Sequence, residues 1–219
     1  EWLNDGLPIS VGFKAVLSDT LARRLLLIAL VNAAPVAVTS TLFLFYVESS
    51  LLVPGLEGPL LLLFFLSAAV AAPFWSKFAE NFGVKPVLLG AMMLAVVAFA
   101  CALTLGQGDW LLFSGVCVLS GAALGADLTL LPAIFAERMA QISPSAAEGF
   151  SLWSFVSKFT LAFSAIIMLP ALEWTGFVSG AVNNPPEALM LLTLLYAGLP
   201  CGLKVVSILL LATTDLKES

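Results

Sequence analysis

Long apolar runs alternate along the chain with short links that contain polar residues, glycine or proline. The runs cover approximately residues 25–47, 60–74, 86–105, 110–135, 149–172 and 188–213, and the second continues towards residue 78. A helix of about 20 residues crosses the ~30 Å hydrocarbon core of a bilayer. Lipid cannot satisfy backbone hydrogen-bonding groups, and the runs lack the ~10-residue alternation of barrel strands. The pattern predicts an all-α polytopic membrane protein with six transmembrane helices.

The same pattern divides the chain into three parts. Residues 1–24 are mixed and partly amphipathic, and we expect them to form a cytoplasmic linker. Residues 25–213 are expected to form the six-helix bundle, and residues 214–219 a cytoplasmic tail. The sequence opens on Glu1 without an initiator methionine, from which we expect a processed, trimmed or partial chain.

Composition supports a membrane protein and argues against other classes. Hydrophobic residues make up 61% of the 219 residues and charged residues 11%, whereas soluble domains average about 45–50% and about 25%. The net charge of −5 comes without a basic stripe, so no nucleic-acid partner is expected. The chain contains no histidine, and no nucleophile motif or metal-spaced cysteine set is evident. We therefore expect the lipid bilayer as a partner and no enzymatic activity.

Basic residues occur only in alternate links. They lie before the first run, between the second and third, between the fourth and fifth, and after the sixth: Lys14, Arg23, Arg24, Lys77, Lys85, Arg138 and Lys217. The other links contain only acidic charges. Positive charge marks cytoplasmic loops, so both termini are expected on the cytoplasmic side.

Four polar side chains interrupt the apolar runs in one layer, namely Asn32, Asp127, Lys158 and Lys204. Counting about 1.5 Å per residue from each run centre puts the three charges roughly 5–6 Å to the cytoplasmic side of the midplane. A charge at a helix centre costs at least about 2.5 kcal/mol on insertion scales, so each should be paired or used. The layer predicts a solute or cation cavity, and Trp153, next to the helix face that carries Lys158, is a candidate to stack on a sugar.

Structural roles are open for each of these residues. Asp127 and Lys158 could form a purely structural ion pair, and Lys204 could extend its ammonium group towards the cytoplasmic interface. Asn32 could join two helices, and Trp153 could belong to an interfacial aromatic belt.

Small residues in the fourth run predict a close helix contact. Gly121 and Gly125 are four residues apart and form a small-xxx-small pattern, and Pro132 is expected to kink the helix.

Several stretches resemble a known family of transporters. They are the link 75–85, the fourth run and following acidic segment over 125–137, the fifth run over 152–158 with its lysine, and more weakly 200–204. These are similar to the loop after helix eight and to helices ten, eleven and twelve of the glycoside-pentoside-hexuronide:cation symporters, the melibiose permease family of the major facilitator superfamily. The chain thus resembles the C-terminal half of a twelve-helix transporter.

The chain departs from the family pattern at two places. The family has an acidic pair three residues apart after helix ten, whereas here Glu137 occupies the first position and Ala140 the second. Glu148-Gly149 lies closer to the lysine of helix eleven than the family spacing implies. The family's cation-binding acids lie in the N-terminal half, outside the part that this chain resembles.

The resemblance implies secondary active transport of a small polar solute, of sugar or glycoside type, in a bacterial inner (plasma) membrane. Coupling would be to a cation, Na⁺ or H⁺, with no other cofactor, and the chain would pair with an N-terminal six-helix half. The cavity residues would be those of the polar layer with Trp153, and the cytoplasmic gate would comprise Lys77, Lys85, Glu137 and Arg138. The alternative is a non-transporting structural or assembly subunit of a larger membrane complex.

Overall fold

The computed structural model describes residues 9–142, 147–181 and 183–216. In this part of the chain every regular element is a helix, and there are no strands. The elements are α1 (Ile9–Ser18), α2 (Thr20–Phe45), η1 (Tyr46–Ser50), α3 (Glu57–Phe82), α4 (Val84–Ala102), α5 (Trp110–Ile142), α6 (Ala147–Glu173), α7 (Pro186–Thr193), η2 (Leu194–Gly198) and α8 (Leu199–Ala212).

Six helical spans in the described residues are long and apolar enough to cross a membrane, which confirms the prediction of six transmembrane helices. They are Thr20–Ser50, Glu57–Phe82, Val84–Ala102, Trp110–Ile142, Ala147–Glu173 and Pro186–Ala212. Several helices extend beyond their apolar runs. The fourth, for example, continues from residue 135 to Ile142, because a helix satisfies its own backbone whether or not the side chains at its end are apolar.

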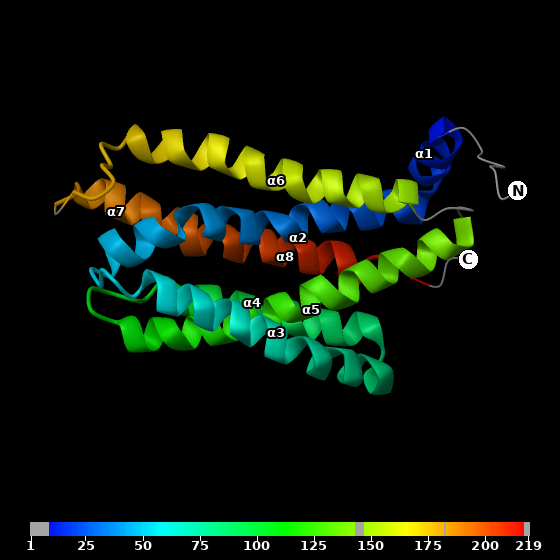
Figure 1. Ribbon diagram of the computed structural model, residues 1–219, viewed down its shortest axis with the longest axis horizontal. Coiled ribbons are helices and arrows are strands. Elements are labelled where there is room, and N and C mark those ends of the chain that lie inside the picture. Colours follow the sequence, from blue (N-terminus) through cyan, green and yellow to red (C-terminus); the bar gives the residue numbers. More distant parts are fainter. Residues whose placement is uncertain (1–8, 143–146, 182, 217–219) are drawn as a thin grey trace, which may run out of the picture.

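The helices pack in two layers. By their contacts the order across the first layer is α6, α2, α5 and α3, with α6 at one edge of the bundle and the crossing pair α5 and α3 at the other (Figure 1). Behind them, α8 packs on α2, and α4 packs on both α5 and α8. In the most apolar window of α5, 56% of residues are buried, but only 22% in α6 and 11% in α3. The two edge helices therefore leave most of their surface for lipid or another membrane segment.

The helices α3 and α5 touch through backbone atoms at two glycines. A Cβ atom added to Gly121 would lie 2.3 Å from the carbonyl oxygen of Phe64, and one added to Gly125 would lie 2.5 Å from that of Ala68. The indole nitrogen of Trp75 also donates to the carbonyl of Ala122, at 2.7 Å. This confirms the predicted small-xxx-small contact, in which the missing side chains let two helices approach closely.

Two π-helical turns, η1 and η2, meet at the end of the bundle far from α1. The rings of Tyr46 in η1 and Tyr196 in η2 stack with centroids 4.1 Å apart. The Tyr46 hydroxyl donates to the carbonyl of Ala102 at 2.8 Å, which ties this corner to α4. The apolar-run pattern does not predict these turns, because a π-helical turn changes the backbone hydrogen bonds without altering composition.

The buried core has two large apolar clusters. One includes Leu25, Met92 and Phe135, nearer the end that carries α1, and the other includes Tyr46 and Phe113, nearer the opposite end. The buried polar residues of α2 and α8 lie between the segments that these helices contribute to the two clusters. The polar layer thus separates the two halves of the core.

We expect Gly125→Ala to weaken the α3–α5 contact, because its Cβ would collide with a backbone oxygen that cannot move alone. Overpacking of this kind typically costs about 1–3 kcal/mol. The matched control is Gly115→Ala on the same helix, where an added Cβ meets no atom within 4 Å. Thermal unfolding in detergent should show a lower midpoint for the first variant only. Equal midpoints for the two variants would contradict the backbone contact.

Candidate functional site

Three residues of the predicted polar layer meet inside the bundle. Lys204 of α8 donates from Nζ to Asn32 Oδ1 of α2 at 2.7 Å, and it forms a hydrogen-bonded ion pair with Asp127 Oδ2 of α5. All three side chains are buried, with Lys204 only 2% exposed. Lys204 therefore does not extend towards the interface, the alternative left open by its long side chain. We call these three residues the buried triad.

The buried triad leaves one of its strong acceptors without a donor. Asp127 Oδ1 is buried and has no hydrogen-bond partner among the described residues. A buried polar atom left unsatisfied typically costs about 1–3 kcal/mol, and more where the group is charged. Lys204 thus compensates the charge of Asp127 through one oxygen, and the second oxygen needs a donor that the described part of the chain does not supply.

A cavity of about 210 Å³ adjoins the buried triad between α2, α5 and α6. Asn32 and Asp127 form part of its wall, and Trp153 and Ser157 of α6 form another part. The remaining lining is apolar: Ala29, Ala33, Val36, Ala37, Leu124, Leu128, Leu131, Pro132 and Leu161. An apolar cavity with a few placed polar groups is the usual form of a small-molecule site. We call it the central cavity.

Lys158 lies apart from the buried triad. Its side chain is exposed on α6, where it borders a shallow depression with Ser151 and Ser154. The ion pair between Asp127 and Lys158, which the sequence left open, is not formed. The reason is angular: five residues separate Trp153 from Lys158, so they point about 140° apart around a helix of 3.6 residues per turn. Trp153 lines the central cavity, and Lys158 faces the outside of the bundle.

The end of the bundle that carries α1 also holds the end of α8 (Figure 1), and we call it the basic end after Arg24, Lys85 and Arg138. There Lys85 donates from Nζ to the carbonyls of Ala212 and Thr214, at 3.0 and 2.7 Å. The carbonyls at a helix C-terminus have no intrahelical donor, and a lysine is a favourable partner for them.

Arg24 adds a second connection to the end of α8. It donates to the hydroxyls of Thr213 and Thr214, each at 2.7 Å. The first and last membrane helices are thereby joined at the basic end.

Arg138 pairs with the residue that begins α2. Its guanidinium contacts both carboxylate oxygens of Asp19, at 3.1 and 2.6 Å, and it also donates to Gln141 at 3.0 Å. Asp19 caps α2 by accepting from the backbone N–H of Ala22 at 2.7 Å. The hydrogen bond from Arg138 lowers the pKa of Asp19 below its ordinary value, against the opposing effect of partial burial.

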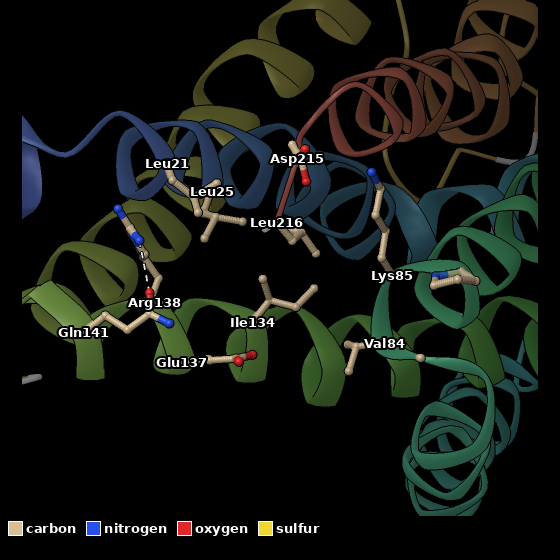
Figure 2. A pocket seen from close by; sticks show the side chains of 12 residues that line it. Leu21, Leu25, Val84, Lys85, Ile134, Glu137, Arg138, Gln141, Asp215 and Leu216 are labelled. Carbon is tan, nitrogen blue, oxygen red and sulfur yellow. Dashed lines mark hydrogen bonds between the residues drawn. The ribbon is translucent and has the colours of Figure 1, made fainter. Parts of the chain in front are cut away.

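Three of the four predicted gate residues surround a second cavity at the basic end. Lys85, Glu137 and Arg138 line this space of about 410 Å³ together with the chain segment that follows α8. Figure 2 shows these side chains around the cavity, with Asp215 and Leu216 across from Glu137. Lys77 does not line it and is exposed on α3. The gate role itself stays a prediction.

We expect Lys204→Met to destabilise the fold, because it leaves the buried Asp127 carboxylate without a counter-charge. Breaking a buried pair on one side typically costs about 3–5 kcal/mol, whereas replacing both partners by apolar residues is often neutral. The double variant Asp127→Leu with Lys204→Met should therefore unfold at a clearly higher midpoint in detergent than the single variant, with a smaller loss that comes from Asn32 Oδ1, which also loses its donor. A single variant as stable as the wild type would argue against the pair.

The Asp19–Arg138 pair should stabilise the fold to its full extent only above about pH 4. The folded-state pKa of Asp19 is lowered, so its contribution is present above the unfolded value of about 3.9 and is lost as the pH falls through the folded value. Asp19→Asn keeps a good N-cap but removes the charge. The difference in unfolding midpoint between wild type and variant should shrink as the pH falls from 6 towards 3. A constant difference would contradict the ionic origin.

Comparison with known proteins places the chain among transporters. Residues 1–218 match the sequence model of the family described as MFS/sugar transport protein. The chain is 27% identical over 166 residues to sodium-dependent lysophosphatidylcholine symporter 1 of Gallus gallus, an alignment that covers 73% of this chain and 31% of that protein. The Xenopus tropicalis protein of the same name is 25% identical over 166 residues, with the same coverage.

The chain spans about a third of the length of these curated relatives. The match to the family model, by contrast, extends over nearly the whole of this chain. The resemblance to a major facilitator transporter is therefore confirmed, and the matched family is one of transporters rather than of enzymes. The chain belongs to the MFS/sugar transport protein family of the major facilitator superfamily.

Proposed function

We propose that this chain forms one six-helix half of a cation-coupled secondary transporter, and that the central cavity belongs to its solute path. The observation that carries the proposal is the buried triad at the wall of that cavity. Ionisable residues inside membrane helices are costly, and they typically mark substrate or ion pathways. A bundle with only a structural role would have no need to place an incompletely satisfied carboxylate beside a cavity.

The second half of such a transporter would cover the open side of this bundle. Facilitator transporters rock two six-helix bundles about a site near the bilayer midplane. The edge helices α3 and α6 are the least buried of the spans, and the central cavity is bounded by α2, α5 and α6. An N-terminal half that packs against this layer would enclose the cavity. It would also bring its own residues close to the exposed Lys158.

We assign the coupling role to Lys158 and Na⁺. The relatives are sodium-dependent symporters by name, which favours Na⁺ over H⁺. An exposed ammonium group on a helix that faces the other half would pair with carboxylates there whenever the cation is absent. Cation binding would release Lys158, because both positive charges compete for the same acids. The cation site itself would then lie mainly outside this chain.

Two solute classes have support. The family description names sugar transport, and the relatives are named for lysophosphatidylcholine. The lining of the central cavity suits either, because it combines a largely apolar surface with Asp127, Asn32 and the ring of Trp153. The expected bacterial inner membrane stays a prediction, which localisation of the tagged protein would check.

We expect Lys158→Ala to reduce Na⁺-driven uptake ~10-fold or more, the equivalent of about 1.4 kcal/mol. Its folding should be unaffected because Lys158 is exposed. The measurement is uptake of labelled lysophosphatidylcholine and of a labelled disaccharide by proteoliposomes, with protein purified from its native membrane. Lys14→Ala on α1, another exposed lysine, is the matched control.

Three results would count against the proposal. Wild-type uptake by the Lys158→Ala variant would refute the coupling role. Uptake that is independent of the Na⁺ gradient would refute coupling to sodium. A folded protein that transports neither probe would favour the structural or assembly subunit instead.

A further inference from the structure

We propose that Asp127 is the residue through which this half recognises its solute, and that its Oδ1 atom accepts a hydrogen bond from a free aliphatic hydroxyl group. Lys204 acts on this interaction as a positioning residue. The inference rests on the proposed function, and it separates the solute site from the cation site within the polar layer.

The unsatisfied oxygen defines where the solute would bind. Lys204 occupies Asp127 Oδ2, and its second bond, to Asn32 Oδ1, holds the ammonium between α2 and α5. Asp127 lines the central cavity and is only 8% exposed, and its Oδ1 has no donor among the described residues. Because Oδ1 has almost no accessible surface in this structure, a donor group that enters the cavity would satisfy it only after the Asp127 carboxylate turns towards the cavity. Within the buried triad, Lys204 Nζ, Asn32 Oδ1 and Asp127 Oδ2 already have partners.

The local charge balance selects an uncharged donor. Lys204 cancels the charge of Asp127, so a second cation would meet the ammonium group already bound to the same carboxylate. Hard metal cations also require several oxygen ligands. The cavity wall offers few, because Asn32 Oδ1 already accepts from Lys204 and the Ser157 hydroxyl donates to the carbonyl of Trp153 at 3.0 Å. A neutral hydroxyl forms a short, charge-assisted bond with a carboxylate and needs no further ligands.

Sugars and lysophospholipids both carry a free aliphatic hydroxyl group. Sugars carry several aliphatic hydroxyls, and a lysophospholipid carries one on its glycerol where an acyl chain is missing. The apolar lining and the ring of Trp153 would contact the carbon surface that surrounds the hydroxyl in either compound. One acceptor atom beside an apolar wall thus accounts for a family that is associated with two different kinds of solute.

Lys204 does not touch the solute in this arrangement. It approaches from α8, behind α2 and α5, and it is absent from the cavity lining. Its role is to hold Asp127 through Oδ2 and to fix which oxygen remains available. A positioning role of this kind predicts that loss of the pair changes solute selectivity even where the fold is kept.

The test compares each solute with its methyl ether, which keeps the charge but replaces the hydroxyl donor by a bulkier methoxy group that cannot donate. The probes are lysophosphatidylcholine and its 2-O-methyl ether, and a disaccharide and its per-O-methyl ether. Binding is measured by calorimetry on protein purified from its native membrane, independently of uptake. A bond to a charged acceptor is worth about 1.5–3 kcal/mol, so the hydroxyl compound should bind at least about tenfold more tightly than its ether.

Variants then assign this preference to Asp127. The double variant Asp127→Leu with Lys204→Met, which keeps its fold by the prediction above, should bind hydroxyl compound and ether equally. Ser207→Ala, at a fully buried position one turn along α8, is the matched control and should keep the preference. Preference for lysophosphatidylcholine alone would identify the glycerol hydroxyl as the ligand, and preference for the disaccharide alone a saccharide hydroxyl. Both outcomes support the proposal.

Other outcomes overturn it. Equal binding of hydroxyl compounds and ethers by the wild type, a preference that survives in the double variant, or no binding of either hydroxyl probe would each do so. The proposed function fails by a different result, namely hydroxyl-selective binding without Na⁺-driven uptake. Na⁺-driven uptake without hydroxyl selectivity would keep the transporter and reject only the role of Asp127.

Discussion

The ion pair between Asp127 and Lys204 is the interaction on which the arrangement of this bundle depends. It lies among apolar helices, where neither charge can be left alone, because an unpaired buried charge costs several kcal/mol. The pair connects α5 with α8, and the bond from Lys204 to Asn32 adds α2. Three helices from both layers must therefore keep a common register and rotation for the charges to meet. The single unsatisfied oxygen of Asp127 is what distinguishes this arrangement from a purely structural one.

Contacts elsewhere in the bundle keep these helices in place by different means. At Gly121 and Gly125 the backbones of α3 and α5 are in contact, and the hydrogen bond from Trp75 to the carbonyl of Ala122 also joins these two helices. At the basic end, Lys85 and Arg24 hold the end of α8, and Arg138 holds the start of α2. At the opposite end, the stacked rings of Tyr46 and Tyr196 join the two π-helical turns. The helix α6 has fewer polar contacts of this kind. It packs against α2, and this contact bounds the central cavity.

This distribution suits a bundle that moves as a unit against a second one. Hydrogen bonds at both ends of the bundle join α2, α4 and α8, whereas the surfaces of α3 and α6 remain largely unburied. The two lysines of the polar layer consequently have different surroundings. Lys204 is enclosed and has two partners within the described chain, and Lys158 is exposed on the edge helix α6. In the transporter that we propose, the first would organise the solute site, and the second would respond to the other half.

The sequence by itself determined the fold class, the six spans and the presence of costly charges within them. These three features can be read from the order of residues along the chain, because lipid forces the backbone of an apolar run of sufficient length into a helix. The glycine contact could also be predicted, since a four-residue spacing places both glycines on one helix face. Which lysine pairs with Asp127 was decided only by tertiary structure. Lys158 and Lys204 lie at similar predicted depths, and the choice between them depends on the rotation of each helix about its axis and on which helices are neighbours. Both are set by packing among all six helices, and no single run of sequence contains that information.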